Sequence, residues 1–282
     1  MTQGKEPRRK PGSAPDRSDQ PHDSWDNVAS WYDGLASDQG TDYHRGVVIP
    51  GTLKLLAAQR GESVLDIACG QGAVARALYE TGARVTGVDL SPRLIEAARR
   101  RSAPGLRFIV GDARSITGLA PGSFDAAVCV LAAQNIDPIA PVFASAARLL
   151  RTHGRFVTVI SHPAFRIPRQ SRWKLDAGRK LLAREVDSYL SEMRIPIDMK
   201  PFKGPGREIT HTHHRPLQAY VTALVSAGMV VDALEEWTSH RSSQPGPMAR
   251  AENRARSEIP MFLGIRALKL ADATRQTGSK QD

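Results

Sequence analysis

Three aspartates stand where strands of this chain are expected to end, and small residues follow each of them. Asp66 lies in the stretch VLDIACGQG, Asp89 in VTGVDLS and Asp112 in FIVGDA. A carboxylate at the tip of a buried strand accepts hydrogen bonds from a ligand and attracts positive charge. The glycines Gly70 and Gly72 allow the backbone to approach that ligand closely. These residues predict a small-molecule site at three neighbouring strand ends.

The turn after Asp66 fits two kinds of nucleotide site. Residues 70–75, GQGAVA, match the pattern G-x-G-x-x-G/A, which places a pyrophosphate at a helix N-terminus. A carboxylate directly before the turn would repel a pyrophosphate, whereas it would attract an ammonium or a sulfonium group. Asp112 adds an acceptor for an adenine amino group. The residues therefore favour a positively charged adenosyl cofactor, with a nicotinamide cofactor as the alternative.

Strands and helices alternate regularly in the middle of the chain, which predicts an α/β fold with a parallel sheet and right-handed crossovers. Ser91 is the expected N-cap of one of these helices, with Pro92 at its first position. Two further strands after a helix at 216–228 complete the sheet. The expected strands are 63–68, 84–90, 106–113, 123–133, 155–161, 229–240 and 258–270, and the other expected helices are 44–59, 72–82, 91–102 and 138–154.

A basic insertion interrupts this alternation after the fifth strand. Between residues 161 and 207 the chain has eleven lysines and arginines against five acids, a net charge of +6. We expect a helix within it, over residues 179–193. The predicted organisation is a disordered tail (1–24), N-terminal lid helices (25–60), the cofactor-binding core (61–161), the basic substrate cap (162–214), a C-terminal helix with the last two strands (215–272), and a disordered tail (273–282).

The bulk composition narrows the class of protein. The chain has 282 residues, of which 41% are hydrophobic, and a formal net charge of +10. No apolar run approaches the roughly 20 residues that a membrane-spanning helix needs. Two cysteines, Cys69 and Cys129, cannot form a disulfide framework. We therefore expect a cytoplasmic enzyme, and the positive charge favours an anionic partner without identifying one.

Four stretches, VLDIACGQG, VTGVDLS, FIVGDA and FDAAVCVLAAQNI, resemble in order and spacing the motifs of class I S-adenosylmethionine-dependent methyltransferases. The resemblance covers residues 62–161. The preceding stretch WDNVASWYDGLA is similar to the lid helix of the ubiquinone/menaquinone C-methyltransferase-like group. The resemblance implies a doubly wound, mostly parallel, seven-stranded Rossmann-like sheet, with S-adenosyl-L-methionine as cofactor.

The resemblance also implies roles for individual residues. Asp66 and the turn from Gly70 to Gly72 would hold the methionine end of the cofactor. Asp89 would accept hydrogen bonds from both ribose hydroxyls. Ala68 stands where the family often has glycine. The implied cofactor-binding residues are Asp66, Ala68, Gly70, Gly72, Asp89, Leu90 against the adenine, Asp112 on its amino group, Ala113 on a ring nitrogen, and Tyr32 on the lid.

The methyl acceptor should bind beyond the ends of the fourth and fifth strands. Positioning can supply about 7–11 kcal/mol of the barrier reduction, so a catalytic base is optional. His162 is the candidate base, with hydrogen bonding to local backbone as the alternative. The candidate substrate-binding residues are Gln134, Asn135, Arg166 and Trp173. We expect no metal site, although the stretch HTHHR at 211–215 invites that interpretation.

Three functions remain open from the residues. The first is methyl transfer to a small metabolite, aromatic or acidic. The second is an RNA methyltransferase that uses the basic insertion, where aromatic side chains would stack on bases. The third is a non-catalytic relative that binds S-adenosylmethionine or a protein partner. A small-molecule methyltransferase is the interpretation we carry forward.

Overall fold

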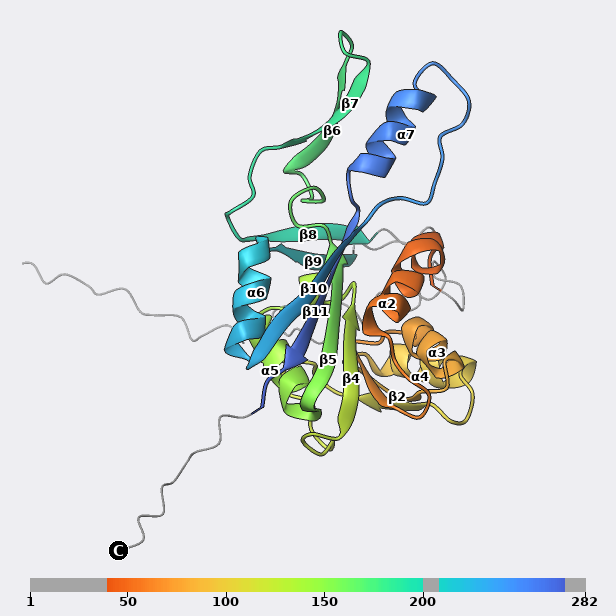
Figure 1. The fold of residues 1–282 in the computed structure, drawn as a ribbon, viewed down its shortest axis with the longest axis vertical. Helices are drawn as coiled ribbons and strands as arrows, with labels where there is room; N and C mark the ends of the chain where they lie inside the picture. The colour runs from red at the N-terminus through yellow and green to blue at the C-terminus, as the bar shows by residue number, and fades with distance from the viewer. Residues whose placement is uncertain (1–39, 200–207, 272–282) are drawn as a thin grey trace, which may run out of the picture.

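The computed structural model describes residues 40–199 and 208–271, and their centre is a seven-stranded sheet in the order β10-β11-β5-β4-β1-β2-β3 (Figure 1). The strands from β3 to β5 are parallel, and β11 pairs antiparallel with both β5 and β10. This confirms the predicted mostly parallel, seven-stranded α/β fold. The strands are β1 (Ser63–Ile67), β2 (Arg84–Asp89), β3 (Arg107–Val110), β4 (Phe124–Val130), β5 (Leu150–Ser161), β10 (Met229–Trp237) and β11 (Phe262–Lys269).

Helices cover both faces of the sheet, because side chains alternate between its two faces. Leu65 and Ile67 of β1 belong to the core cluster that also includes residues of α5 and α6. Val64 belongs to the second cluster, with residues of α2, α3 and α4. The helices are η2 (His44–Val48), α2 (Ile49–Leu56), α3 (Ala73–Glu80), α4 (Pro92–Arg101), η3 (Ala133–Asn135), α5 (Ala140–Leu149), α6 (Leu217–Ser226) and α7 (Ala249–Glu258).

The insertion after β5 consists of strands in its described part, so the helix predicted over residues 179–193 is wrong. β6 (Ser171–Asp176) pairs antiparallel with β7 (Leu181–Val186), and β8 (Met193–Met199) pairs antiparallel with β9 (Glu208–His214). The Asp176 carboxylate accepts a hydrogen bond from the Arg179 backbone N–H at 2.9 Å, which closes the turn between β6 and β7. Cross-strand pairing and this turn outweigh the helix propensity of the leucines, alanine and arginines in the segment.

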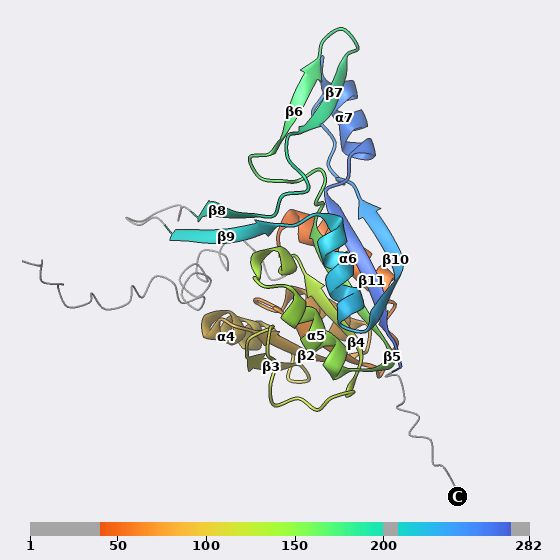
Figure 2. The ribbon, with the colours of Figure 1, turned by 90° about the vertical axis from the view of Figure 1, so that its left-hand side faces the viewer.

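The two hairpins of the insertion differ in where they lie. Figure 2 shows β8 and β9 above the ends of the central strands, and β9 contacts η3, the short helix that follows β4. The β6–β7 hairpin stands farther out, beside α7, a helix that the sequence analysis did not predict (Figure 1). Only Ala255 of α7 is buried, so its sequence has little apolar periodicity. No helix in the two described ranges is long and apolar enough to cross a membrane.

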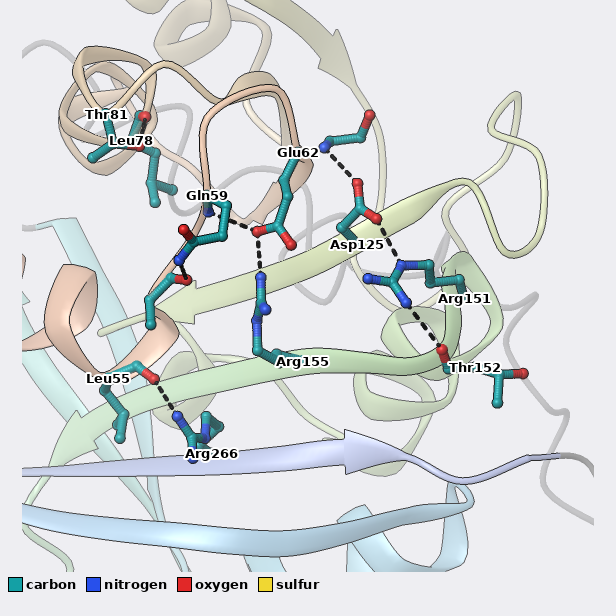
Figure 3. A network of polar contacts seen from close by, with 12 residues as sticks. Leu55, Gln59, Glu62, Leu78, Thr81, Asp125, Arg151, Thr152, Arg155 and Arg266 are labelled. Atoms are coloured by element: carbon teal, nitrogen blue, oxygen red, sulfur yellow. Dashed lines mark hydrogen bonds and ion pairs between the residues drawn. The ribbon is translucent and has the colours of Figure 1, made fainter.

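A network of polar contacts fastens the amino ends of the central strands (Figure 3). The Glu62 carboxylate accepts a hydrogen bond from the Gln59 backbone N–H at 2.8 Å and forms an ion pair with Arg155 of β5. The Asp125 carboxylate at the start of β4 accepts a hydrogen bond from the Ser63 backbone N–H at 2.8 Å. These contacts join β1, β4 and β5 at the edge opposite the three strand-end aspartates.

The residues expected to be disordered tails, 1–24 and 273–282, lie outside the described residues, as does the first part of the predicted lid, including Tyr32. The helix predicted over residues 44–59 is present as η2 and α2. Ser91 caps α4 as predicted, because its hydroxyl oxygen accepts a hydrogen bond from the Leu94 backbone N–H at 3.2 Å.

Candidate functional site

The carboxylate of Asp66 is buried at the end of β1, only 1% exposed, and its Oδ2 has no hydrogen-bond donor within the described residues. Burial and the neighbouring carboxylate of Asp89 raise the pKa of Asp66 to about 8, although the Ala75 backbone N–H acts against this shift. An acidic group that is buried, close to a second acid and incompletely paired is costly to keep in a site that binds nothing. This arrangement fits a ligand that brings positive charge.

Asp89, at the end of β2, holds the glycine turn in place. Its Oδ2 accepts a hydrogen bond from the Gly70 backbone N–H at 2.8 Å, and its Oδ1 accepts one from the Ser91 backbone N–H at 2.9 Å. The carboxylate thus joins the turn after β1 to the start of α4.

The backbone of the turn leaves room beside Gly70. Among the described residues, a Cβ built on Gly70 would meet nothing within 4 Å, whereas a Cβ on Gly72 would lie 3.0 Å from the ring of Phe108. Gly72 therefore serves close packing between the turn and β3, and Gly70 borders open space. Ala68 adopts a left-handed φ of 55°, which costs a non-glycine residue roughly 1–2 kcal/mol. Such strain is typical of functional turns.

Asp112 lies two residues beyond β3, and it is paired with an arginine that the sequence analysis did not single out. The guanidinium of Arg114 forms an ion pair with Asp112, with 2.7 Å between Nη2 and Oδ2, and the Arg114 backbone N–H donates to Oδ1 at 2.8 Å. Arg114 also donates to the Asp137 carbonyl at 3.1 Å. An adenine amino group would have to share the Asp112 carboxylate with Arg114. The neighbouring Ala113 is buried and Leu90, after β2, is half-buried.

Two side-chain amides follow β4 and bind the same carbonyl. Gln134 Nε2 donates to the Leu131 carbonyl at 3.0 Å, and Asn135 Nδ2 donates to it at 3.3 Å. Leu131 has a left-handed φ of 52°. Thr212 of β9 donates its hydroxyl proton to the Gln134 carbonyl at 3.3 Å. The β8–β9 hairpin and the end of β4 are therefore in direct contact at the predicted acceptor side of the sheet.

A buried arginine that the sequence analysis missed anchors the same segment. Arg215 is 3% exposed, and its Nη2 donates to the Ile136 carbonyl at 2.9 Å and pairs with Asp137 Oδ1 at 2.5 Å. It follows β9 directly, so it ties the β8–β9 hairpin and the start of α6 to the loop after β4. Arg215 and Asp137 are 78 residues apart in sequence, so no local sequence pattern predicts that they pair.

His162 lies at the end of β5 with both ring nitrogens engaged. Its Nδ1 accepts a hydrogen bond from the Ala164 backbone N–H at 3.2 Å, and its Nε2 lies 2.7 Å from Glu236 Oε1. Because Nδ1 is the acceptor, Nε2 carries the proton and donates to Glu236. Burial lowers the pKa of His162, and the hydrogen bond to Glu236 opposes this shift. These contacts stabilise the turn after β5. The lone pair on Nδ1, with which a general base would take up a proton, already accepts a hydrogen bond.

The structure does not bring Arg166 and Trp173 to the strand-end aspartates. Trp173 lies on β6, and the guanidinium groups of Arg166 and Arg184 stack on its ring at 5.4 and 5.1 Å. Arg166 also donates to the Pro260 carbonyl at 3.2 Å. These contacts link the β6–β7 hairpin to the chain just after α7. Their predicted substrate role therefore requires a ligand that reaches this outer hairpin.

The three histidines of HTHHR lie on β9. His211 Nδ1 lies 3.4 Å from Arg194 Nη2, and His214 Nε2 donates to the Tyr189 carbonyl at 2.7 Å. In the described ranges, no three histidine, cysteine or acidic side chains gather as metal ligands would.

Comparisons with known proteins agree with this geometry. Residues 65–158 match a family model described as a methyltransferase domain. The chain is 40% identical over 114 residues to a demethylmenaquinone methyltransferase of Tropheryma whipplei, which covers 39% of this chain and 46% of that protein. It is 38% identical over 93 residues to a ubiquinone biosynthesis O-methyltransferase of Xanthomonas campestris, covering 32% and 39%. The chain thus spans about half the length, or less, of these curated relatives.

A solved structure resembles a larger part of the chain. An S-adenosylmethionine-dependent methyltransferase from Mesorhizobium loti is 27% identical, with a TM-score of 0.61, and the match covers 78% of this chain and 96% of that one. A glycopeptide N-methyltransferase bound to S-adenosylmethionine shares the fold at 18% identity, with a TM-score of 0.53. The matched core of 65–158 contains Asp66, the glycine turn, Asp89 and Asp112.

Proposed function

We propose that this chain, which is a class I S-adenosylmethionine-dependent methyltransferase, moves the methyl group of its cofactor onto a small aromatic acceptor. The names of the curated relatives, both from quinone biosynthesis, support an aromatic acceptor. The single observation that carries the proposal is the buried Asp66 beside Asp89, with one acidic oxygen unpaired among the described residues.

The residues at the strand ends fit S-adenosylmethionine. Asp66 would attract the positive charge of its amino acid end, and the open space beside Gly70 would admit it. Asp89, which holds the Gly70 and Ser91 backbone, would accept hydrogen bonds from the ribose hydroxyls. Asp112 would accept the adenine amino group beside its ion pair with Arg114.

When bound, the cofactor would supply a methyl group on a sulfonium sulfur, and that sulfur would leave as a neutral thioether when the acceptor takes the methyl group in line. The chain then has to orient the acceptor and exclude water. Holding the reacting groups in the right geometry can lower the barrier by about 7–11 kcal/mol. The β8–β9 hairpin over η3 would serve that purpose. If the acceptor must lose a proton, His162 could take it only after releasing the Ala164 backbone N–H.

Deuterated S-adenosylmethionine tests the proposal directly. The full chain is incubated with trideuteromethyl cofactor and a library of small aromatic acids, phenols and quinols, and products are read by mass spectrometry. We expect a labelled small molecule, and at least about tenfold slower labelling with an Asp89→Asn variant when the cofactor is subsaturating. Label in cellular RNA added to a parallel reaction would instead assign the chain to RNA methylation. Absence of S-adenosylhomocysteine in every reaction would contradict the proposal.

A further inference from the structure

The side chain of Gln134 combines a fixed orientation with an unused acceptor. Its Nε2 donates to the Leu131 carbonyl at 3.0 Å. This contact fixes the orientation of the amide, because Oε1 in the same place would be repelled by the carbonyl oxygen. Its Oε1 is buried and has no donor among the described residues. A buried acceptor without a donor costs about 1–3 kcal/mol. The cost is recovered if a ligand brings the missing donor.

The backbone around Gln134 is held from two sides. The Thr212 hydroxyl of β9 donates to the Gln134 carbonyl, and Arg215 binds the Ile136 carbonyl and the Asp137 carboxylate. These contacts come from the hairpin above the sheet and from the start of α6. The segment therefore cannot rotate to satisfy Gln134 Oε1 without breaking contacts to a second part of the chain.

The local backbone is also strained. Leu131, whose carbonyl orients the Gln134 amide, has a left-handed φ of 52°. A residue with a branched, bulky side chain is rare in this region, and such strain concentrates at functional sites. Leu131 follows β4 directly, at the crevice edge where open α/β sheets bind ligands.

From these observations we propose that Gln134 Oε1 accepts a hydrogen bond from an O–H or N–H group of the methyl acceptor. This inference rests on the proposed methyl transfer, and it narrows the substrate class to aromatic molecules that carry a hydroxyl or amino group. A neutral amide does not take up the proton, so Gln134 determines specificity and does not act as a base. A molecule whose hydroxyl is already methylated leaves the acceptor unpaired and binds less tightly.

Two ligands that differ by one hydrogen-bond donor test this inference. The full chain, saturated with S-adenosylhomocysteine, is titrated with 1-naphthol and with 1-methoxynaphthalene. We expect 1-naphthol to bind at least about tenfold more tightly, the discrimination of about one buried hydrogen bond. In Gln134→Met, whose side chain has similar length and no amide, we expect this preference to disappear while affinity for S-adenosylhomocysteine stays within twofold.

The matched control is Gln59→Met. The Gln59 side chain also donates to a backbone carbonyl, that of Ala57 at 2.9 Å, but it is exposed at the opposite edge of the sheet (Figure 3). This variant should keep the full preference. Unchanged affinity of Gln134→Met for S-adenosylhomocysteine separates loss of the acceptor from loss of fold.

Equal binding of the two naphthalenes to the wild-type chain, no binding of either, or a preference that survives in Gln134→Met would overturn the inference. None of these results touches the proposed methyl transfer, which stands or falls on cofactor binding and on the labelled product. A wild-type chain that does not bind S-adenosylhomocysteine would contradict the proposed function itself.

Discussion

The two ends of the central strands are built from similar residues but paired differently. At the amino ends, Glu62 and Asp125 each receive an arginine and a backbone N–H (Figure 3). At the carboxyl ends, Asp66 Oδ2 and Gln134 Oε1 are the buried side-chain acceptors without a donor in the described ranges. The other buried side-chain atoms without a partner in the described ranges are donors, Arg155 Nε at the amino edge and Arg215 Nη1 after β9. Both belong to guanidinium groups that form ion pairs through their other nitrogens.

This difference separates the stabilising edge of the sheet from the binding edge. Charges paired within the chain, such as those of Glu62 and Asp125, stabilise the fold. Unpaired acceptors and left-handed residues, such as Ala68 and Leu131 directly after β1 and β4, lower stability unless a ligand compensates for them. The comparison predicts that substitutions at the amino edge change stability and that substitutions at the carboxyl edge change binding.

The largest effect is expected at Glu62. Its side chain is 15% exposed and that of Arg155 is 22% exposed, so Glu62→Ala leaves a mostly buried guanidinium without its partner. We expect the free energy of unfolding to fall by about 2–3 kcal/mol, somewhat below the usual cost of breaking a fully buried pair. Urea denaturation measures it. Affinity for S-adenosylhomocysteine should stay within twofold, and a large loss of affinity would remove the distinction between the two edges.

Asp89→Asn, in contrast, should lower cofactor affinity more than it lowers stability. The substitution keeps the side-chain shape, but its amide nitrogen cannot accept the backbone N–H that one carboxylate oxygen accepts. Hydrogen bonds from a ligand to this side chain should weaken by about 1.5–3 kcal/mol, the usual value for bonds to a charged group. Titration calorimetry with S-adenosylhomocysteine should therefore show roughly a tenfold to hundredfold loss of affinity. Unchanged affinity would exclude Asp89 from the cofactor site.

The pH dependence of binding sharpens the role of Asp66. In the native, cofactor-free chain its pKa is raised from 3.8 to about 8, so this group stabilises the fold below about pH 4 and that contribution is lost as the pH rises towards 8. A positively charged cofactor favours the carboxylate, so binding at pH 7 should release about one proton, and affinity should rise between pH 6 and 8.

Calorimetry in buffers of different ionisation enthalpy counts those protons. Asp66→Asn should release none and should flatten the pH dependence of unfolding between pH 4 and 8. Proton release that persists in this variant would show that another group is responsible.

The smallest effect is expected at Trp173. Its ring stacks with Arg166 and Arg184 on the outer hairpin and is 37% exposed. Trp173→Leu should lower the free energy of unfolding by about 1 kcal/mol through the lost cation–π contacts and should leave cofactor affinity unchanged. An altered KM for the methyl acceptor at unchanged cofactor affinity would restore the substrate role predicted for Trp173.

The core of the fold could be predicted because its apolar runs are short, buried and separated by clear caps. β4 is nearly continuous in apolar residues, and Ser91 with Pro92 marks the start of α4. The insertion could not be predicted in the same way. Its leucines and arginines are compatible with a helix, and only the turn at Asp176 and the pairing of β6 with β7 make it a hairpin.

In the candidate site, too, some residues could be predicted from the sequence and others could not. The strand-end aspartates could be predicted because each lies at or just after the end of a recognisable apolar strand. Their partners could not, because pairs such as His162 with Glu236 and Arg215 with Asp137 join residues 74 and 78 positions apart. Only the folded chain shows that the nitrogens of His162 are already engaged and that the Gln134 oxygen is not.

A crystal structure of the full chain with S-adenosylhomocysteine tests the central claim most directly. The account predicts the ribose on the Asp89 carboxylate, the adenine beside Asp112, and the amino acid end between Asp66 and Gly70. A nucleoside bound elsewhere, or one from which the Asp66 and Asp89 side chains point away, would contradict it.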